Sequence, residues 1–141
     1  MKHGFTLIEL LIVFSILIII FALGMPLTIN YYQSYQLISE RDNMVGLLRR
    51  VRTFSLANRN SLPHGLHLGS DAYTLFTGES FMNRDPAFDE IFPKSGAATV
   101  GGPAEIVFSP LSATTTGGTL MLNVGPQSAS VLINATGGIS W

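Results

Sequence analysis

The sequence contains no cysteine, and charged residues make up only 12% of it. The lack of cysteine excludes a disulfide framework, a thiolate nucleophile and any cysteine-based zinc or haem site. Lys and Arg number 8 against 9 Asp and Glu, which gives a formal net charge of -1. This net charge does not indicate a nucleic acid or an anionic lipid as the main partner.

Motifs of catalytic and metal sites are also scarce. Ser55, Ser61 and the threonines at 114–116 have no G-x-S-x-G turn and no Asp/His partner set around them, so no catalytic residues are predicted. His64 and His67 form an H-x-x-H pattern, but residues three apart on a strand point to opposite faces. We therefore expect a non-enzymatic protein without a metal site or a cofactor.

One acidic segment, NRDPAFDE at residues 83–90, brings Asp85, Asp89 and Glu90 close together in the chain. Carboxylate oxygens suit calcium, but this spacing matches no known calcium loop. A solvated acidic loop is the favoured interpretation, and calcium binding is left open.

The most prominent feature of the sequence is an apolar run from Phe5 to Met25. As a helix, its 21 residues would rise about 31 Å, which matches a hydrocarbon core of roughly 30 Å. A cleaved secretory signal peptide is a rival, but its apolar region is usually shorter and ends at a small-residue site that is lacking here. Lys2 precedes the run, and Arg41 is the first basic residue after it. We predict one span with a cytoplasmic N-terminus and an exported C-terminal body.

The helix is expected to continue beyond the apolar run, with a break at Gly24 and Pro26. Residues 38–57 contain no proline, and their apolar residues recur at steps of three and four, which is typical of one helical face. The helix should end near residues 58–60 or at Pro63. The residues of the apolar face are Met44, Leu47, Leu48, Val51 and Phe54.

The chain beyond Pro63 is rich in turn and strand signals, and 12 of the 14 glycines lie beyond residue 45. Residues 65–68 and 72–77 predict a hairpin, and further strands are predicted at 104–108, 119–123, 130–134 and 139–141. We expect an α+β fold in which a small antiparallel sheet covers the apolar face of a long N-terminal helix.

Glu9 is the one carboxylate in the apolar run. A charge near the centre of a bilayer costs roughly 2.5 to 3.5 kcal/mol, so a compensating interaction is required. If the chain were cut before Phe5, the new amino group would lie one helical turn from Glu9, and the amine of a neighbouring helix could reach this carboxylate. Staggered copies of the helix would then be held in register.

Residues 4–10, GFTLIEL, resemble the N-terminal signal of type IV prepilins and of the pseudopilins of type II secretion. The resemblance implies cleavage between Gly4 and Phe5 by a prepilin peptidase and N-methylation of Phe5. It also assigns Thr6 and Glu9 to subunit assembly, and a helix break near Pro26 is a further shared feature.

The C-terminal part is similar to H-type minor pseudopilins and related minor pilins, on residues 104–110 and 131–139. The expected organisation is a cleaved leader at 1–4, a transmembrane and assembly helix at 5–25, its amphipathic half at 26–60 and an exported β-rich body at 61–141. The resemblance implies an inner-membrane protein that enters a filament. Its partners would be other pilin or pseudopilin subunits and an inner-membrane assembly platform.

The expected function is that of a structural filament subunit, a minor pseudopilin of type II secretion. A minor type IV pilin in adhesion, motility or DNA uptake is the alternative, and a single-pass anchored binding domain is an alternative of another class. Arg49, Arg50, Arg52 and Arg59 could contact DNA, but they lie on different helical faces. A solvated face is the favoured interpretation, and nucleic acid is not the expected partner.

Overall fold

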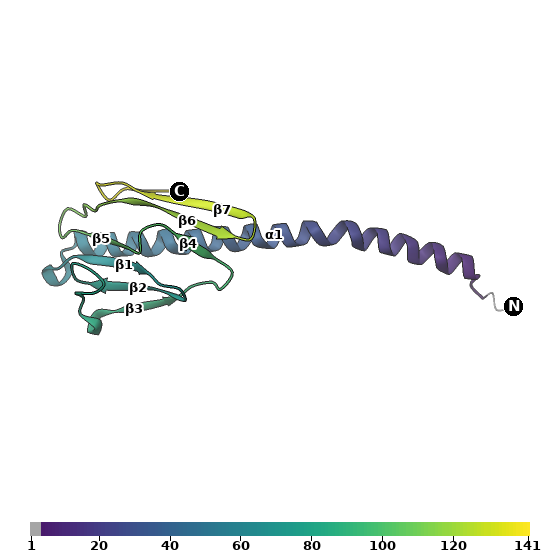
Figure 1. Ribbon diagram of the computed structural model, residues 1–141, viewed down its shortest axis with the longest axis horizontal. Helices are drawn as coiled ribbons and strands as arrows, with labels where there is room; N and C mark the ends of the chain where they lie inside the picture. The colour runs from purple at the N-terminus through teal and green to yellow at the C-terminus, as the bar shows by residue number, and fades with distance from the viewer. Residues whose placement is uncertain (1–3) are drawn as a thin grey trace.

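The computed structural model describes residues 4–141, except for the side chains of residues 23–28. A single long helix runs along the molecule, and a β-rich body surrounds its C-terminal half while the N-terminal half projects away from the body (Figure 1). The helix packs on antiparallel sheets, so the predicted α+β class is confirmed.

The long helix, α1, extends from Leu7 to Leu56. A hydroxyl cap at Thr6 begins it, and Asn58 in the left-handed conformation follows its end. The short 3₁₀ helix η1 then covers Arg59–Ser61. The helix was predicted to end near residues 58–60 and ends at Leu56. Residues 58–60 belong to the turn that follows it.

The break predicted at Gly24 and Pro26 falls within residues 23–28, whose side chains lie outside the described residues. The backbone of α1 is helical through both positions, so the helix is not interrupted there. A proline removes one backbone hydrogen bond and distorts the preceding turn, which leaves a helix free to continue beyond it. A bend at this point remains a prediction.

The body contains two four-stranded antiparallel sheets, whereas one sheet was predicted. The first has the order β3-β2-β1-β5 and the second β4-β6-β7-β8. The predicted strands are all present, but β3 and β4 and the 3₁₀ helix η2 were missed because segments of three or four residues carry too little periodicity. The bounds are β1 His64–Leu68, β2 Ala72–Thr77, η2 Pro86–Phe88, β3 Glu90–Pro93, β4 Thr99–Gly101, β5 Glu105–Phe108, β6 Gly118–Val124, β7 Gln127–Ile133 and β8 Ile139–Ser140.

The core lies between the C-terminal half of α1 and both sheets. Met44, Leu48 and Val51 are fully buried, Leu47 is almost so, and Phe54 packs at the edge, so the predicted apolar face is confirmed. Burying one such side chain contributes about 1.5 to 3 kcal/mol. The sheets contribute Leu66, Ile106, Phe108, Leu120, Leu122, Val131 and Ile133 to the same core.

Two buried polar contacts fasten α1 to the first sheet. The Tyr73 hydroxyl donates a hydrogen bond of 2.6 Å to Oε1 of Glu40. Near the end of the helix, the Ser55 hydroxyl donates to the Phe108 carbonyl at 3.0 Å. Both join residues far apart in the sequence, so they fix the position of the body along the helix.

Candidate processing and assembly site

The predicted cleavage and assembly residues lie at the start of α1, at the end of the molecule away from the body (Figure 1). Thr6 is the N-cap, and its hydroxyl accepts a hydrogen bond of 3.3 Å from the backbone N–H of Glu9. Thr6 and Glu9 therefore have the spacing of a capping box, T-x-x-E, which satisfies a free backbone donor at the helix start. The sequence reading missed this local role, although the motif itself would have revealed it.

Glu9 lies in the first turn of α1 and its side chain is exposed. The partial positive charge at the helix N-terminus favours a carboxylate there by about 0.3 to 1 kcal/mol. Among the described side chains, Glu9 has no ion-pair partner. The local helix environment thus offsets only a part of the cost of roughly 2.5 to 3.5 kcal/mol that a charge in a bilayer incurs.

Gly4 precedes the cap and is exposed. A Cβ atom built at Gly4 would have no other atom within 4 Å. A larger residue at this position would therefore fit the fold of this chain, and any need for glycine has to arise from an outside contact, such as the active site of a peptidase.

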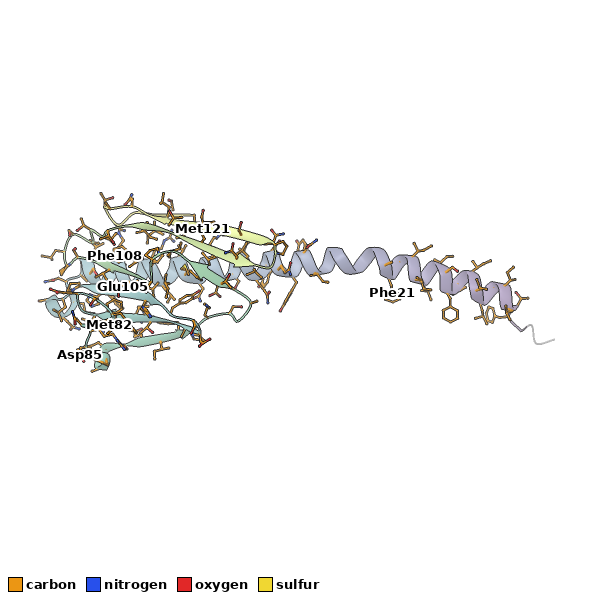
Figure 2. All side chains as sticks on the ribbon, in the orientation of Figure 1. Phe21, Met82, Asp85, Glu105, Phe108 and Met121 are labelled. Carbon is orange, nitrogen blue, oxygen red and sulfur yellow. The ribbon has the colours of Figure 1, made fainter. Side chains whose placement is uncertain are left out.

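The N-terminal half of α1 is apolar on every face. Over residues 7–22, the exposed fraction of the large apolar side chains ranges from 42% at Leu17 to 81% at Leu7. Figure 2 shows these side chains, Phe21 among them, projecting away from the helix with no part of the body near them. A helix that is hydrophobic all round is normally buried, in a membrane or among other helices.

Among the described residues, no helix is long and apolar enough to cross a membrane. The predicted span includes residues 23–28, whose side chains lie outside that description.

The acidic residues at 85–90 are engaged separately. Asp85 caps η2 through the N–H of Ala87 at 3.0 Å. Asp89 pairs with Arg84 at 2.8 Å, and Glu90 pairs with Arg50 at 2.6 Å. Within the part of the chain that the structure describes, no three metal-ligating side chains come together. The three carboxylates therefore form no shared calcium site in this conformation.

His64 and His67 lie on opposite faces of β1, as predicted. The ring of His64 packs edge-on to Phe54 of α1 with centroids 5.8 Å apart, whereas His67 stacks on Phe81 at 3.7 Å. The two imidazoles therefore have different surroundings and do not share a ligand position.

Three of the four arginines considered for a nucleic acid contact different groups of their own chain, and the Nε atom of the fourth, Arg52, is buried. Arg49 lies 4.4 Å from the centre of the Trp141 ring, and Arg59 lies 4.7 Å from that of Phe54. Arg50 is paired with Glu90. The guanidinium groups of Arg49 and Arg59 lie over aromatic rings and that of Arg50 is paired with a carboxylate, so these groups do not form one basic stripe for a nucleic acid.

Residues 1–25 match the family model of the prokaryotic N-terminal methylation motif. The searches of curated proteins and of solved structures found no match. The match covers the same residues as the capped helix start and the exposed apolar turns. The chain therefore carries a prepilin-type signal, which implies processing by a prepilin peptidase and assembly with other pilin-like subunits, at the head of an α+β fold consistent with that of pilins.

Proposed function

We propose that this protein is a structural, non-enzymatic subunit of a pilus-like filament, and in particular a minor pseudopilin of the type II protein secretion system. The observation that carries the proposal is the methylation motif at residues 1–25, placed on a helix whose N-terminal half is exposed and apolar on every face. Such a surface requires lipid or other helices around it.

In the proposed mechanism, the apolar half of α1 first anchors the precursor in the inner membrane with the body exported. Cleavage after Gly4 frees the amine of Phe5, which remains cationic after methylation. This amine pairs with Glu9 of a neighbouring subunit as the helices pack together in the filament. The pair supplies the compensation that the helix dipole and the Thr6 cap leave incomplete.

The continuous helix supports this mechanism, since α1 joins the assembly end to the core without a loop. The hydrogen bonds of Glu40 and Ser55 to residues of the first sheet attach the body to the same helix. Docking of the N-terminal half in a filament would therefore set the position of the body on the outside.

Two alternatives remain under test. A minor type IV pilin would use the same processing and docking residues, so the two differ in their neighbouring subunits. A single-pass anchored binding domain would require neither cleavage at Gly4 nor the charge at Glu9. Use as a DNA-uptake pilin is disfavoured by the arginines, which contact rings and a carboxylate of this chain.

The first experiment is intact mass and N-terminal sequencing of the protein from native membranes that contain the peptidase. We expect a terminus at N-methylated Phe5 in the wild type. Gly4→Leu should leave the precursor uncleaved, and Gly96→Leu should be processed normally, because a Cβ atom at either glycine has open space around it. An intact Met1 in the wild type would refute the proposal and favour the anchored binding domain.

A cross-linking experiment distinguishes a pseudopilin of the secretion system from a minor type IV pilin. Because the chain has no thiol of its own, Leu10→Cys provides one unique cross-linking position on the exposed apolar half of α1. We expect adducts with pseudopilins of the secretion system. Adducts with type IV pilins alone would assign the protein to a pilus instead.

A further inference from the structure

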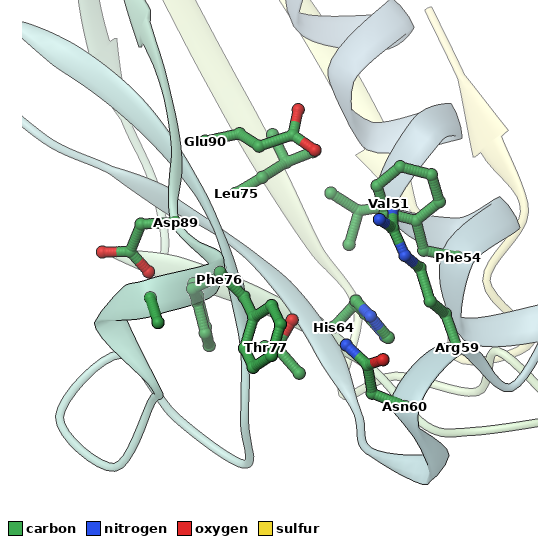
Figure 3. Close-up of a pocket in the computed structure, with 12 residues that line it drawn as sticks. Val51, Phe54, Arg59, Asn60, His64, Leu75, Phe76, Thr77, Asp89 and Glu90 are labelled. Carbon is green, nitrogen blue, oxygen red and sulfur yellow. The ribbon is translucent and has the colours of Figure 1, made fainter.

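A cavity of about 220 Å³ lies at the C-terminal end of α1, at the opposite end of the molecule from the processing site. One wall comes from the end of α1, η1 and the start of β1, and the other from β2, η2 and β3 (Figure 3). Phe54, Arg59, Asn60 and His64 line the first wall, and Thr77 and Glu90 belong to the second.

Two buried polar residues line this cavity, Thr77 and His64, and only 3% of the surface of His64 is exposed. Neither ring nitrogen makes a well-aligned hydrogen bond to a described residue, although the Leu62 carbonyl lies close enough to oppose part of the lowering of the His64 pKa. Buried polar groups are nearly always hydrogen-bonded, so an unpaired one indicates an unseen partner. Because the imidazole lines the cavity, that partner has room to be a ligand.

The carboxylates that line the cavity are in ion pairs, whereas, among the described residues, the arginine that lines it is not. Glu90 is paired with Arg50, and Asp89 with Arg84. The Asp89 oxygen that is buried without a partner, Oδ1, belongs to a carboxylate that Figure 3 shows pointing away from His64. Arg59 takes part in no ion pair within the described chain.

Arg59 and His64 lie against the same aromatic ring. The guanidinium carbon of Arg59 is 4.7 Å from the centre of Phe54, and the imidazole centre of His64 is 5.8 Å from it. Asn60, which is held at a φ of 58°, adds its amide to this wall. The wall therefore offers a cation, an imidazole and an amide, all of which donate hydrogen bonds.

We propose that this cavity binds a carboxylate group, held by the guanidinium of Arg59 and an N–H of His64. A guanidinium matches a planar carboxylate in a two-point contact, and the small volume suits a short acid or the end of an acidic side chain.

Binding should strengthen as the pH falls. Burial, and then the charge of Arg59, hold the pKa of His64 below its ordinary value, while the Leu62 carbonyl opposes this shift. The other charged groups facing the cavity, Asp89 and Glu90 with their arginine partners, are already neutralised as pairs. A bound carboxylate would favour the imidazolium, so it should raise the pKa of His64 and bind more tightly below about pH 6.5.

The test is a solution NMR titration of the full chain in detergent micelles, with the His64 ring and the Asn60 amide observed. Sodium propionate serves as the probe, and propionamide is its uncharged match in shape. We expect saturable shifts and a raised His64 pKa with propionate only. Arg59→Gln should weaken binding roughly tenfold, and Arg49→Gln, which alters the arginine over Trp141, should not weaken it.

The source of the carboxylate is tested with an acetylated and amidated Gly-Glu-Gly peptide. Tighter binding of the peptide than of propionate points to a polypeptide side chain, and exclusion of the peptide points to a free acid. Either result upholds the proposal if Arg59→Gln weakens binding. Equal binding of propionamide, unchanged binding in Arg59→Gln, or the absence of shifts, which would mean a cavity filled by water only, would overturn it.

Discussion

At the residue scale, Glu9 has two separable roles. Its backbone N–H, at the third helical position, donates to the Thr6 cap, and its carboxylate provides the charge that the proposed assembly requires. Glutamine is accepted at that capping position as well as glutamate. The charge can therefore be removed while the local motif is kept.

We predict that Glu9→Gln leaves α1 helical and the precursor cleaved, but impairs incorporation into filaments as strongly as Glu9→Ala. The reason is that both variants lack the carboxylate that would pair with a neighbouring amine. The measurement is the amount of Leu10→Cys cross-linked adduct in each background. Ser15→Ala is the control, because it removes only a side-chain hydrogen bond to the Leu11 carbonyl and leaves both the Thr6 cap and the charge in place. Normal adducts in Glu9→Gln would contradict the pairing.

We also predict a loss of stability in mild acid that originates from His64. Its pKa is lowered in the fold by burial and by Arg59, so below about pH 6.5 the unfolded chain takes up a proton that the folded chain does not. The free energy of unfolding should fall by at most about 1.4 kcal/mol per pH unit from this group. Urea unfolding across this range should show a shallower pH dependence in His64→Gln. An identical slope in that variant would exclude His64 as the cause.

At the element scale, the attachment of α1 to the sheets combines an apolar face with buried polar contacts. The face at Met44, Leu48 and Val51 was predictable because its spacing matches the helical period. Glu40 was not, since a lone glutamate on a helix is usually solvated. Its burial depends on Tyr73, which arrives from β2.

We predict that Tyr73→Phe destabilises the body by about 1.5 to 3 kcal/mol, because the buried Glu40 loses a hydrogen-bond donor. Burial, and then the contact with Glu40, raise the pKa of Tyr73. Its contribution to stability is therefore present below about pH 10 and lost as the pH rises further. Urea unfolding at neutral and alkaline pH measures both effects.

The matched control is Tyr35→Phe, because Tyr35 is 69% exposed on α1, the helix that carries Glu40. It should leave both the stability and its alkaline loss unchanged. If Tyr73→Phe lost stability with alkaline pH as steeply as the wild type, the assignment to Tyr73 would be wrong.

At the scale of the whole molecule, the two halves of α1 have different surroundings. The C-terminal half is packed under two sheets, and the N-terminal half has none of the body near it (Figure 1). A substitution on the exposed half should therefore affect association with lipid or with other subunits, and leave the folding of the body unchanged.

We predict that Leu17→Lys blocks stable membrane association and filament incorporation. A lysine near the middle of the apolar half costs roughly 2.5 to 3.5 kcal/mol in lipid, and the apolar run has no carboxylate within one helical turn of it. Extraction of membranes with alkaline carbonate and the Leu10→Cys cross-link measure the two effects. Urea unfolding of the body should stay as in the wild type, and Ser15→Ala should behave as the wild type throughout. Retention of Leu17→Lys in extracted membranes and in adducts would contradict the proposed role of this surface.

The sequence by itself determined the processing signal, the long helix and its apolar faces, and most of the strands. These features depend on neighbouring residues and on short periodic patterns, which are local properties of the chain. Tertiary structure alone decided the division into two sheets, the burial of Glu40 against Tyr73, and the cavity at Arg59 and His64. Each of these results from contacts between segments distant in the sequence, whose energies arise only when the body packs around the helix.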